Sequence, residues 1–196
     1  FHKIVADMAD IPRLQAKTIN LGLFYGMGKA KLQAELGVSK QKADDLFQLY
    51  HSKVPFVKQL MNAVSNRAQR RGQIRTLLGR LCRFHLWEPN YFGIHKPLSL
   101  EEAVQEHGPG GIKRAFTYKA LNKLIQGSAA DMTKKCMLDL YKEGIIPHIQ
   151  IHDELDISVE DDKQAKRIVQ IMEAAVELKV PNKVDYEAGK NWGDIH

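Results

Sequence analysis

The stretch IPRLQAKTINLGLFYG, residues 11–26, has a spacing that predicts a helix with one mixed cationic and aromatic face. Arg13, Lys17, Leu21 and Tyr25 stand four residues apart, so on a helix they lie along the same side. The two cations are at the amino-terminal end, where the helix dipole is also positive. Such a face suits a triphosphate, with an apolar and an aromatic group beyond it to stack on a base. On spacing alone, an ordinary helix whose cations face solvent is the commoner alternative.

Charge and cysteine content narrow the class of protein. The 196 residues carry a net charge of +6, which favours a polyanionic partner without deciding the matter. The two cysteines, Cys82 and Cys136, form no C-x-x-C pair, which fits a reducing cytosol and argues against a disulfide framework or a zinc knuckle. No apolar stretch approaches the roughly 18 residues of a membrane span, and residues 1–10 are too charged for a secretory signal. The chain begins at Phe1 rather than Met, which suggests a cut or processed piece.

Capping residues and periodicity predict mostly helix in the first half of the chain and mixed structure in the second, an α+β fold. A hairpin with its turn at Gly79 is predicted in residues 74–84, followed by a loop region over 86–112. Helices are predicted at 11–25, 29–36, 39–53, 55–71, 98–107, 112–141 and 161–179, and strands at 145–151, 155–159 and 183–188.

Basic residues concentrate in the middle of the chain. A guanidinium donates bidentately to phosphate, so an arginine cluster predicts salt-dependent duplex binding, although a solvated basic face is equally compatible. The residues are Arg67, Arg70, Arg71, Arg75, Arg80 and Arg83, with Lys113, Arg114, Lys119 and Lys123 further along.

The stretch ALNKLIQGSAADMTKK, residues 120–135, combines two amides with a run of small residues. Asn122 and Gln126 are four apart, and an amide offers the donor and acceptor that suit minor-groove base edges. Small side chains at 127–130 would let another backbone approach closely. Ordinary packing of a helix against a sheet is the commoner alternative.

Three ionisable groups interrupt the strand-like run IPHIQIHDELDIS, residues 146–158. An isolated Asp-Glu pair between strands is most often an exposed turn. If functional, it would bind Mg²⁺, which prefers oxygen ligands. In an extended chain Asp153 and Glu154 point to opposite faces, and His152 shares the face of Glu154. We therefore expect neither a plain turn nor a complete metal site, but one ligand, Asp153, that needs a second carboxylate from elsewhere.

Taken together, these stretches resemble the motifs of family A DNA polymerases, the class that includes bacterial DNA polymerase I. The first helix matches R-x-x-x-K-x-x-N-[FL]-G-x-x-Y-G without a gap. The segment RRGQIRTLLGR is similar to the family's R-x-x-G-y-v-x-T-l-x-G-R, and residues 122–131 match N-x-x-x-Q-G-[ST]-A-A-D. HDE resembles the second palm motif, and GKNWGDIH resembles the family's usual carboxy terminus, so the resemblance spans nearly the whole chain.

The resemblance implies a nucleotide site on the first helix. Arg13 and Lys17 would bind the triphosphate, joined by His2, and Lys17 could also act as general acid to the leaving pyrophosphate. Leu21 would pack against base and sugar, and Tyr25 would lie at the templating position. Leu21 departs from the Phe or Tyr of many bacterial members and is similar to phage and viral enzymes.

The resemblance also implies DNA and metal contacts. Asp153 would hold catalytic Mg²⁺ with a lesser part for Glu154, and two ions are expected. Gly22, which costs the helix about 1 kcal/mol relative to Ala, predicts a close approach that we assign to DNA. Tyr118 stands where many members have Arg, so that contact is not transferred. The other expected DNA contacts are Arg75, Arg80, Asn122, Gln126 and, near the primer end, His152.

The implied fold is part of a right-hand polymerase: helical fingers over residues 1–70, and the carboxy-terminal part of an antiparallel-sheet palm over 71–196, with a loop insertion at 86–112. The family's first palm motif, D-Y-S-x-x-E-x-R, does not occur in the sequence. The missing metal carboxylate and the thumb would come from an amino-terminal polypeptide, either a separate gene product or a removed part of one chain. The other partners would be primer-template DNA and dNTPs, with no membrane, in the cytoplasm of a bacterial host if the gene is phage-encoded.

Two other functions fit the residues less completely. A non-catalytic basic module would bind DNA through its arginines without needing Asp153. A metal-dependent nuclease would cleave DNA with Mg²⁺ and no dNTP, but the sequence shows no second carboxylate cluster to support it.

Overall fold

The computed structural model describes residues 3, 6–7 and 11–195, which divide into two compact units. One unit contains Phe1–Arg75 and Leu81–Ile125, and the other contains Thr76–Arg80 and Gln126–His196. Helices accompany three two-stranded antiparallel sheets, so the predicted α+β class is confirmed. Among the helices described, none combines the length and apolar character that a membrane span requires.

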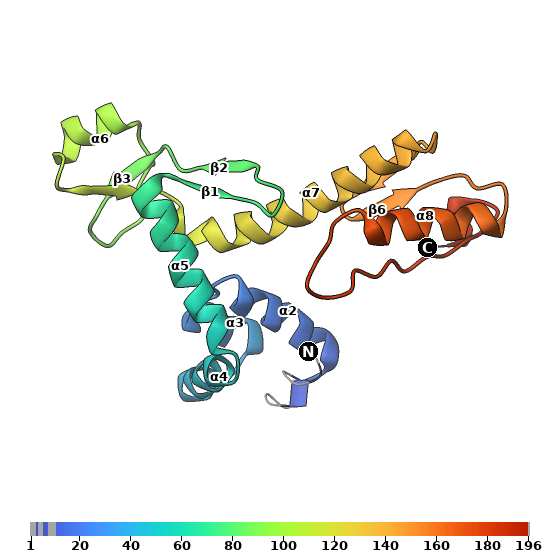
Figure 1. Cartoon of the computed structure of the whole chain (residues 1–196). Helices are drawn as coiled ribbons and strands as arrows, with labels where there is room; N and C mark the ends of the chain where they lie inside the picture. The colour runs from blue at the N-terminus through green and yellow to red at the C-terminus, as the bar shows by residue number, and fades with distance from the viewer. Residues whose placement is uncertain (1–2, 4–5, 8–10, 196) are drawn as a thin grey trace. The chain divides into compact units, whose positions relative to one another are not determined.

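Local signals account for the helices of the first unit (Figure 1). The side chain of Ser39 accepts from the backbone N–H of Lys42 and caps one helix, as the sequence predicts. Pro55 opens the next helix, and Gly72, in the left-handed conformation, ends it. These helices closely match their predicted bounds: α2 (Arg13–Phe24), α3 (Lys29–Leu36), α4 (Lys40–Lys53) and α5 (Pro55–Arg71).

Two apolar clusters hold the first unit together. The first joins α2, α3 and α4 through Ile19, Leu23, Leu32 and Tyr50. The second packs α5 against the predicted hairpin, strands β1 (Gln73–Arg75) and β2 (Leu81–Arg83), whose pairing places Ile74 opposite Cys82. The helices therefore bury one face each and leave the opposite face of α2 open.

The predicted helix over residues 112–141 is wrong in its first part. Ile112–Arg114 forms strand β4, which pairs antiparallel with β3 (Trp87–Pro89), a strand that the sequence did not predict in the loop region. The Arg114 guanidinium lies 4.4 Å from the centre of the Trp87 ring and donates to the Phe84 carbonyl at 2.8 Å. Phe116, with φ of 61°, then prevents the helix from extending further back. The short helix α6 (Leu100–His107) forms as predicted, and a 3₁₀ turn (Thr117–Lys119) leads into α7 (Ala120–Lys142).

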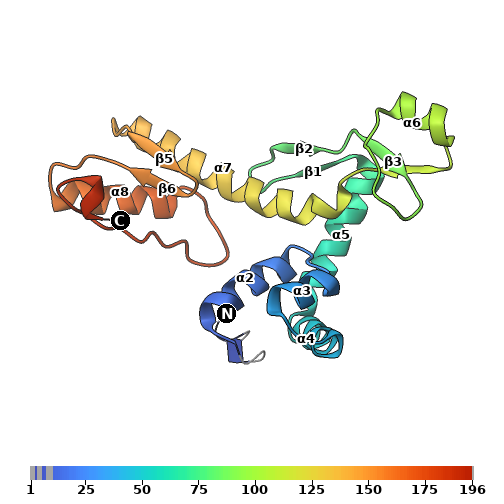
Figure 2. The same ribbon diagram turned by 180° about the vertical axis from the view of Figure 1, so that it is seen from behind.

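The second unit builds a small core on the carboxy-terminal half of α7. Leu140 packs against Ile168 and Ile171 of α8 (Asp162–Ala174), and Leu155 adds the hairpin β5 (Ile149–Ile151) and β6 (Glu154–Asp156) to this cluster. Figure 2 shows the hairpin and α8 from behind. Both strands are shorter than predicted.

The prediction fails for the residues after α8. This helix ends at Ala174 rather than near residue 179, because the Ala175 N–H turns to the Met172 carbonyl. The strand predicted at 183–188 does not form in the described chain. The backbone N–H of Val184 is bonded to the Glu173 carboxylate at 3.2 Å instead of to a neighbouring strand. A strand needs such a neighbour, and its sequence pattern alone cannot provide one.

Candidate functional site

The open face of α2 carries the residues that the sequence assigns to the nucleotide. Arg13 and Lys17 are exposed, Leu21 is 42% exposed, and Tyr25, the residue that ends the helix, is half-buried. The opposite side of the helix is in the core, so packing fixes which side faces outward. His2 lies outside the described residues. The structure thus leaves an exposed helix face with two cations followed by an apolar and an aromatic side chain.

A buried hydrogen bond joins the core-facing side of α2 to α4. Asn20 is only 5% exposed and Tyr50 of α4 only 3% exposed, and the Tyr50 hydroxyl donates to the Asn20 side-chain oxygen at 3.1 Å. Burial raises the pKa of Tyr50 to about 12. The sequence motif contained this asparagine, but its partner, 30 residues away, could not be identified by spacing.

Gly22 has a local packing partner. A Cβ at this position would overlap the side chain of Met27, whose backbone N–H donates to the Gly22 carbonyl at 2.7 Å. A larger residue at this position would therefore displace the end of the flexible Met27 side chain. A DNA contact at Gly22 stays a prediction.

The amides predicted to bind DNA lie on α7. Asn122 and Gln126 are both exposed, one helical turn apart. Arg75, on β1, is also exposed. These positions agree with an open polar surface, and DNA binding by them stays a prediction.

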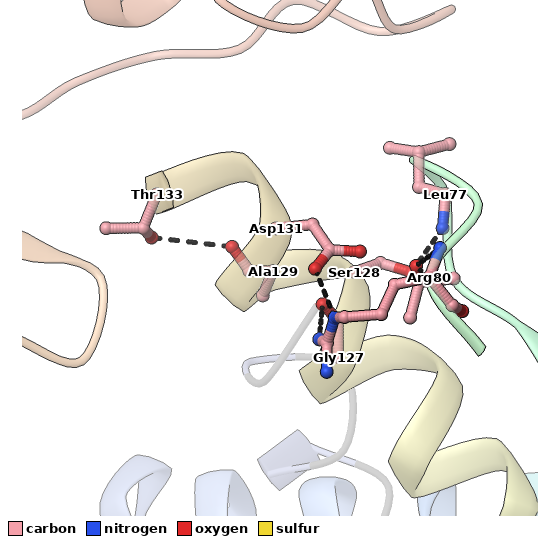
Figure 3. Close-up of polar contacts among 8 residues, drawn as sticks. Leu77, Arg80, Gly127, Ser128, Ala129, Asp131 and Thr133 are labelled. Carbon is pink, nitrogen blue, oxygen red and sulfur yellow. Dashed lines mark hydrogen bonds and ion pairs between the residues drawn. The ribbon is translucent and has the colours of Figure 1, made fainter. Parts of the chain in front are cut away.

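Arg80 is bonded to two residues of α7 (Figure 3). Its Nε donates to the Asp131 carboxylate at 2.6 Å, and its Nη2 donates to the Gly127 carbonyl at 2.8 Å. Burial acts to raise the pKa of Asp131, but hydrogen bonds from Thr76 and Arg80 and the charges of Arg80 and Lys134 outweigh it and lower this pKa overall. The acid, only 7% exposed, therefore forms an ion pair with the arginine. The sequence places Asp131 at the end of the motif over residues 122–131, but it does not identify the partner of this acid.

The prediction that the HDE triplet, residues 152–154, lies in an extended chain is wrong. Ile151 pairs with Glu154, so His152 and Asp153 form the two-residue turn of the β5–β6 hairpin. His152 has φ of 54°, because short hairpin turns need left-handed residues to match the twist of their strands. The alternation argument does not apply in such a turn. The side chains of His152 and Asp153 are both exposed in the β5–β6 turn.

The turn provides carboxylates but not a complete metal centre. Asp153 and Glu154 line one edge of a hollow of about 1190 Å³ in the second unit, together with residues of α7, α8 and the terminal segment. Within the described part of the chain, no three His, Cys, Asp or Glu side chains gather closely enough to hold an ion. The donor chemistry of the two carboxylates suits Mg²⁺.

Comparison with known proteins places these features in a family. The chain is 34% identical to the DNA-directed DNA polymerase of Pseudomonas phage M6 over 98% of its length, and 31% identical to DNA polymerase I of Geobacillus stearothermophilus over 99%. It covers 31% and 21% of those proteins, so it spans a third or less of the curated relatives it matches.

A solved structure gives the same result. The structure is similar to the polymerase domain of Pol1 from M. smegmatis in complex with DNA primer-template and dNTP, with a TM-score of 0.65 and 25% identity. The match covers 92% of this chain and 32% of that one. The family model for DNA polymerase family A matches residues 1–194. The exposed α2 motif, the α7 amides and the HDE turn are therefore parts of a chain that belongs to DNA polymerase family A.

Proposed function

We propose that this chain is the fingers and the carboxy-terminal part of the palm of a template-directed DNA polymerase. Residues 1–70 would form the fingers and 71–196 the palm portion, with an insertion at 86–112. The observation that carries the proposal is the outward face of α2, where two exposed cations precede Leu21 and Tyr25 on one side of a packed helix. As part of a complete enzyme, the chain would work where dNTPs and template meet, in the cytoplasm of a bacterial host if phage-encoded.

The residues of this chain would act mainly by binding and orientation. Arg13 and Lys17, with His2, would hold the triphosphate of an incoming dNTP, and Lys17 would protonate the leaving pyrophosphate. Leu21 would pack against the base and sugar, and Tyr25 would occupy the templating position. Because phosphoryl transfer depends largely on positioning and charge, a rigid helix face suits this work.

The remaining residues would hold primer-template DNA. Asn122 and Gln126 would contact the minor groove, and Arg75 and Gly22 would approach the duplex or template. His152 would lie near the primer end. The positive charge of Arg75 favours a polyanion. All of these residues except the half-buried Gly22 are exposed, so their side chains are accessible.

Family A polymerases use divalent metal ions, and Asp153, assisted by Glu154, would hold Mg²⁺ here. Two bound ions would lower the charge barrier to attack of the primer 3′-hydroxyl on the α-phosphate. The second aspartate would come from an amino-terminal polypeptide that also contains the thumb.

A chimera tests the proposal. This chain replaces the matching segment of the Pseudomonas phage M6 polymerase, and primer extension is measured alongside the isolated chain. The chimera should extend a primer, and the isolated chain should not, because it lacks a metal carboxylate. Asp153→Ala in the chimera should abolish turnover, whereas Lys17→Ala should raise the KM for dNTP and lower kcat.

The alternatives give different results. Robust synthesis by the isolated chain would show that it needs no amino-terminal partner. A folded chimera that binds duplex but ignores Asp153→Ala would point to a non-catalytic binding module. Mg²⁺-dependent cleavage without dNTP would indicate a nuclease.

A further inference from the structure

The hairpin tip, Thr76–Arg80, is bonded to one short segment of α7 (Figure 3). Besides the two bonds from the Arg80 guanidinium, the backbone N–H of Leu77 donates to the Ser128 hydroxyl at 2.9 Å. The tip is itself closed, because the Thr76 N–H donates to the Arg80 carbonyl at 2.9 Å and the Arg80 N–H donates to the Thr76 hydroxyl at 3.0 Å. The tip is therefore a preformed loop that contacts α7 at three positions.

These contacts fall on a different side of α7 from the amides. With 3.6 residues per turn, Gly127 and Asp131 lie one turn apart along one side, and Gln126 continues the side that begins at Asn122. The tip covers the first side, and both amides remain exposed. At Ser128 the neighbouring backbone is that of the chain's own hairpin tip, whose Leu77 N–H donates to the Ser128 hydroxyl.

The helix needs support at this point. Gly127 and Ser128 are weak helix formers, and a mid-helix glycine costs about 1 kcal/mol relative to alanine. Asp131 is a buried charge, which is stable only when paired and hydrogen-bonded. Arg80 supports the helix at both points, because its guanidinium pairs with Oδ1 of Asp131 and also reaches the Gly127 carbonyl next to Gln126.

We propose that Asp131, acting through Arg80, is a positioning residue for duplex binding by Gln126. The ion pair fixes the tip on Gly127 and Ser128, and the tip fixes the turn of α7 that presents the amide. This rests on the proposed function, in which the exposed side of α7 contacts DNA. It gives Arg80 an intramolecular role in place of a phosphate contact.

The test is a double-mutant cycle on DNA affinity, measured by fluorescence anisotropy with the 196-residue chain and a labelled primer-template duplex. Gln126→Ala and Asp131→Asn should each weaken binding about 5-fold, the effect of one hydrogen bond. The double variant should also weaken binding only about 5-fold, because an amide that is no longer positioned has no DNA contact left for the second substitution to remove. A product of about 25-fold would mean independent effects and would overturn the proposal.

Salt dependence separates positioning from a direct phosphate contact. Asp131→Asn should leave the slope of log Kd against log salt unchanged, since the substitution removes no group that touches phosphate. Tighter binding with a steeper slope would mean that Arg80 had been released to bind phosphate, and the proposal would fail. Arg80→Lys, which keeps the charge but cannot bond to both Asp131 and Gly127, should behave like Asp131→Asn and is the second variant if that one is unstable.

Asp139→Asn is the matched control. Asp139 is on the same helix and pairs with Lys135 and Lys142, also with a lowered pKa, mainly from the hydrogen bond of Lys135. This variant should change affinity less than 2-fold and combine additively with Gln126→Ala. If Asp139→Asn and Gln126→Ala were coupled as strongly as Asp131→Asn and Gln126→Ala, the coupling would reflect the general stability of α7. That result would overturn the proposal. Failure of the wild-type chain to bind duplex would instead overturn the proposed function itself.

Discussion

Asn20 and Tyr50 help to determine which side of α2 faces outward. A buried amide and a buried hydroxyl are hydrogen-bonded to each other across α2 and α4, in a core made otherwise of apolar side chains. Rotation of α2 about its axis would break this bond and bury Lys17 or Arg13. The polar pair therefore selects one packing arrangement, in addition to what it contributes to stability.

Tyr50→Phe should lower the free energy of unfolding by about 1 kcal/mol at neutral pH, the usual contribution of a hydrogen bond. The Tyr50 pKa is raised from 10.0 to about 12, so its contribution is complete below pH 10 and is lost as the pH rises towards 12. The difference in unfolding free energy between wild type and Tyr50→Phe should therefore decrease across this pH range, as measured by urea titration. Tyr141→Phe, at an exposed tyrosine of α7, is the control and should show neither effect. A constant margin from about pH 9 to about pH 11.5 would contradict this account.

At the scale of the element, the β5–β6 turn depends on backbone conformation more than on side-chain contacts. His152 adopts a left-handed conformation, which glycine accepts freely and a β-branched residue resists. His152→Gly should leave unfolding nearly unchanged, while His152→Val should cost about 1–2 kcal/mol. His85→Val, at an exposed histidine with ordinary φ, controls for the change of residue type. Equal stability of the two His152 variants in urea would show that the turn tolerates strain.

The helices and the strands differ in how far sequence could predict them. Ser39, Pro55 and Gly72 act within a few residues of themselves, so local pattern located the helices that they bound. Strand β4 exists because Trp87–Pro89 is available to pair with it, and that partner is more than 20 residues away. For the same reason the site could be predicted as side chains on one helix face, whereas Arg80–Asp131 and Asn20–Tyr50 could not.

At the scale of the whole molecule, the chain presents an exposed cationic helix face on α2, exposed amides on α7 and an exposed carboxylate pair at the β5–β6 turn. Sequence alone located the exposed helix face and the carboxylate pair, because the α2 motif and the HDE triplet were visible in it. The hairpin turn that presents Asp153 depends on backbone geometry, and strand alternation predicted the wrong conformation for it. Under the proposed function, the isolated chain should bind DNA without catalysing primer extension.

This affinity should come from a particular surface and not from net charge. Two triple variants lower the charge of +6 equally, by three: Arg67→Gln/Arg70→Gln/Arg71→Gln on α5, and Lys163→Gln/Lys166→Gln/Arg167→Gln on α8, all at exposed positions.

If the arginine cluster binds duplex DNA, the α5 variant should weaken binding at least 10-fold. The slope of log Kd against log salt should also decrease by about 0.9 for each phosphate that is no longer neutralised. The α8 variant should change affinity less than 3-fold, although it removes the same charge. Anisotropy between about 50 and about 200 mM salt measures both quantities. Equal losses of affinity in the two variants would mean that binding depends on net charge alone. The α5 arginines would then form an ordinary solvated surface.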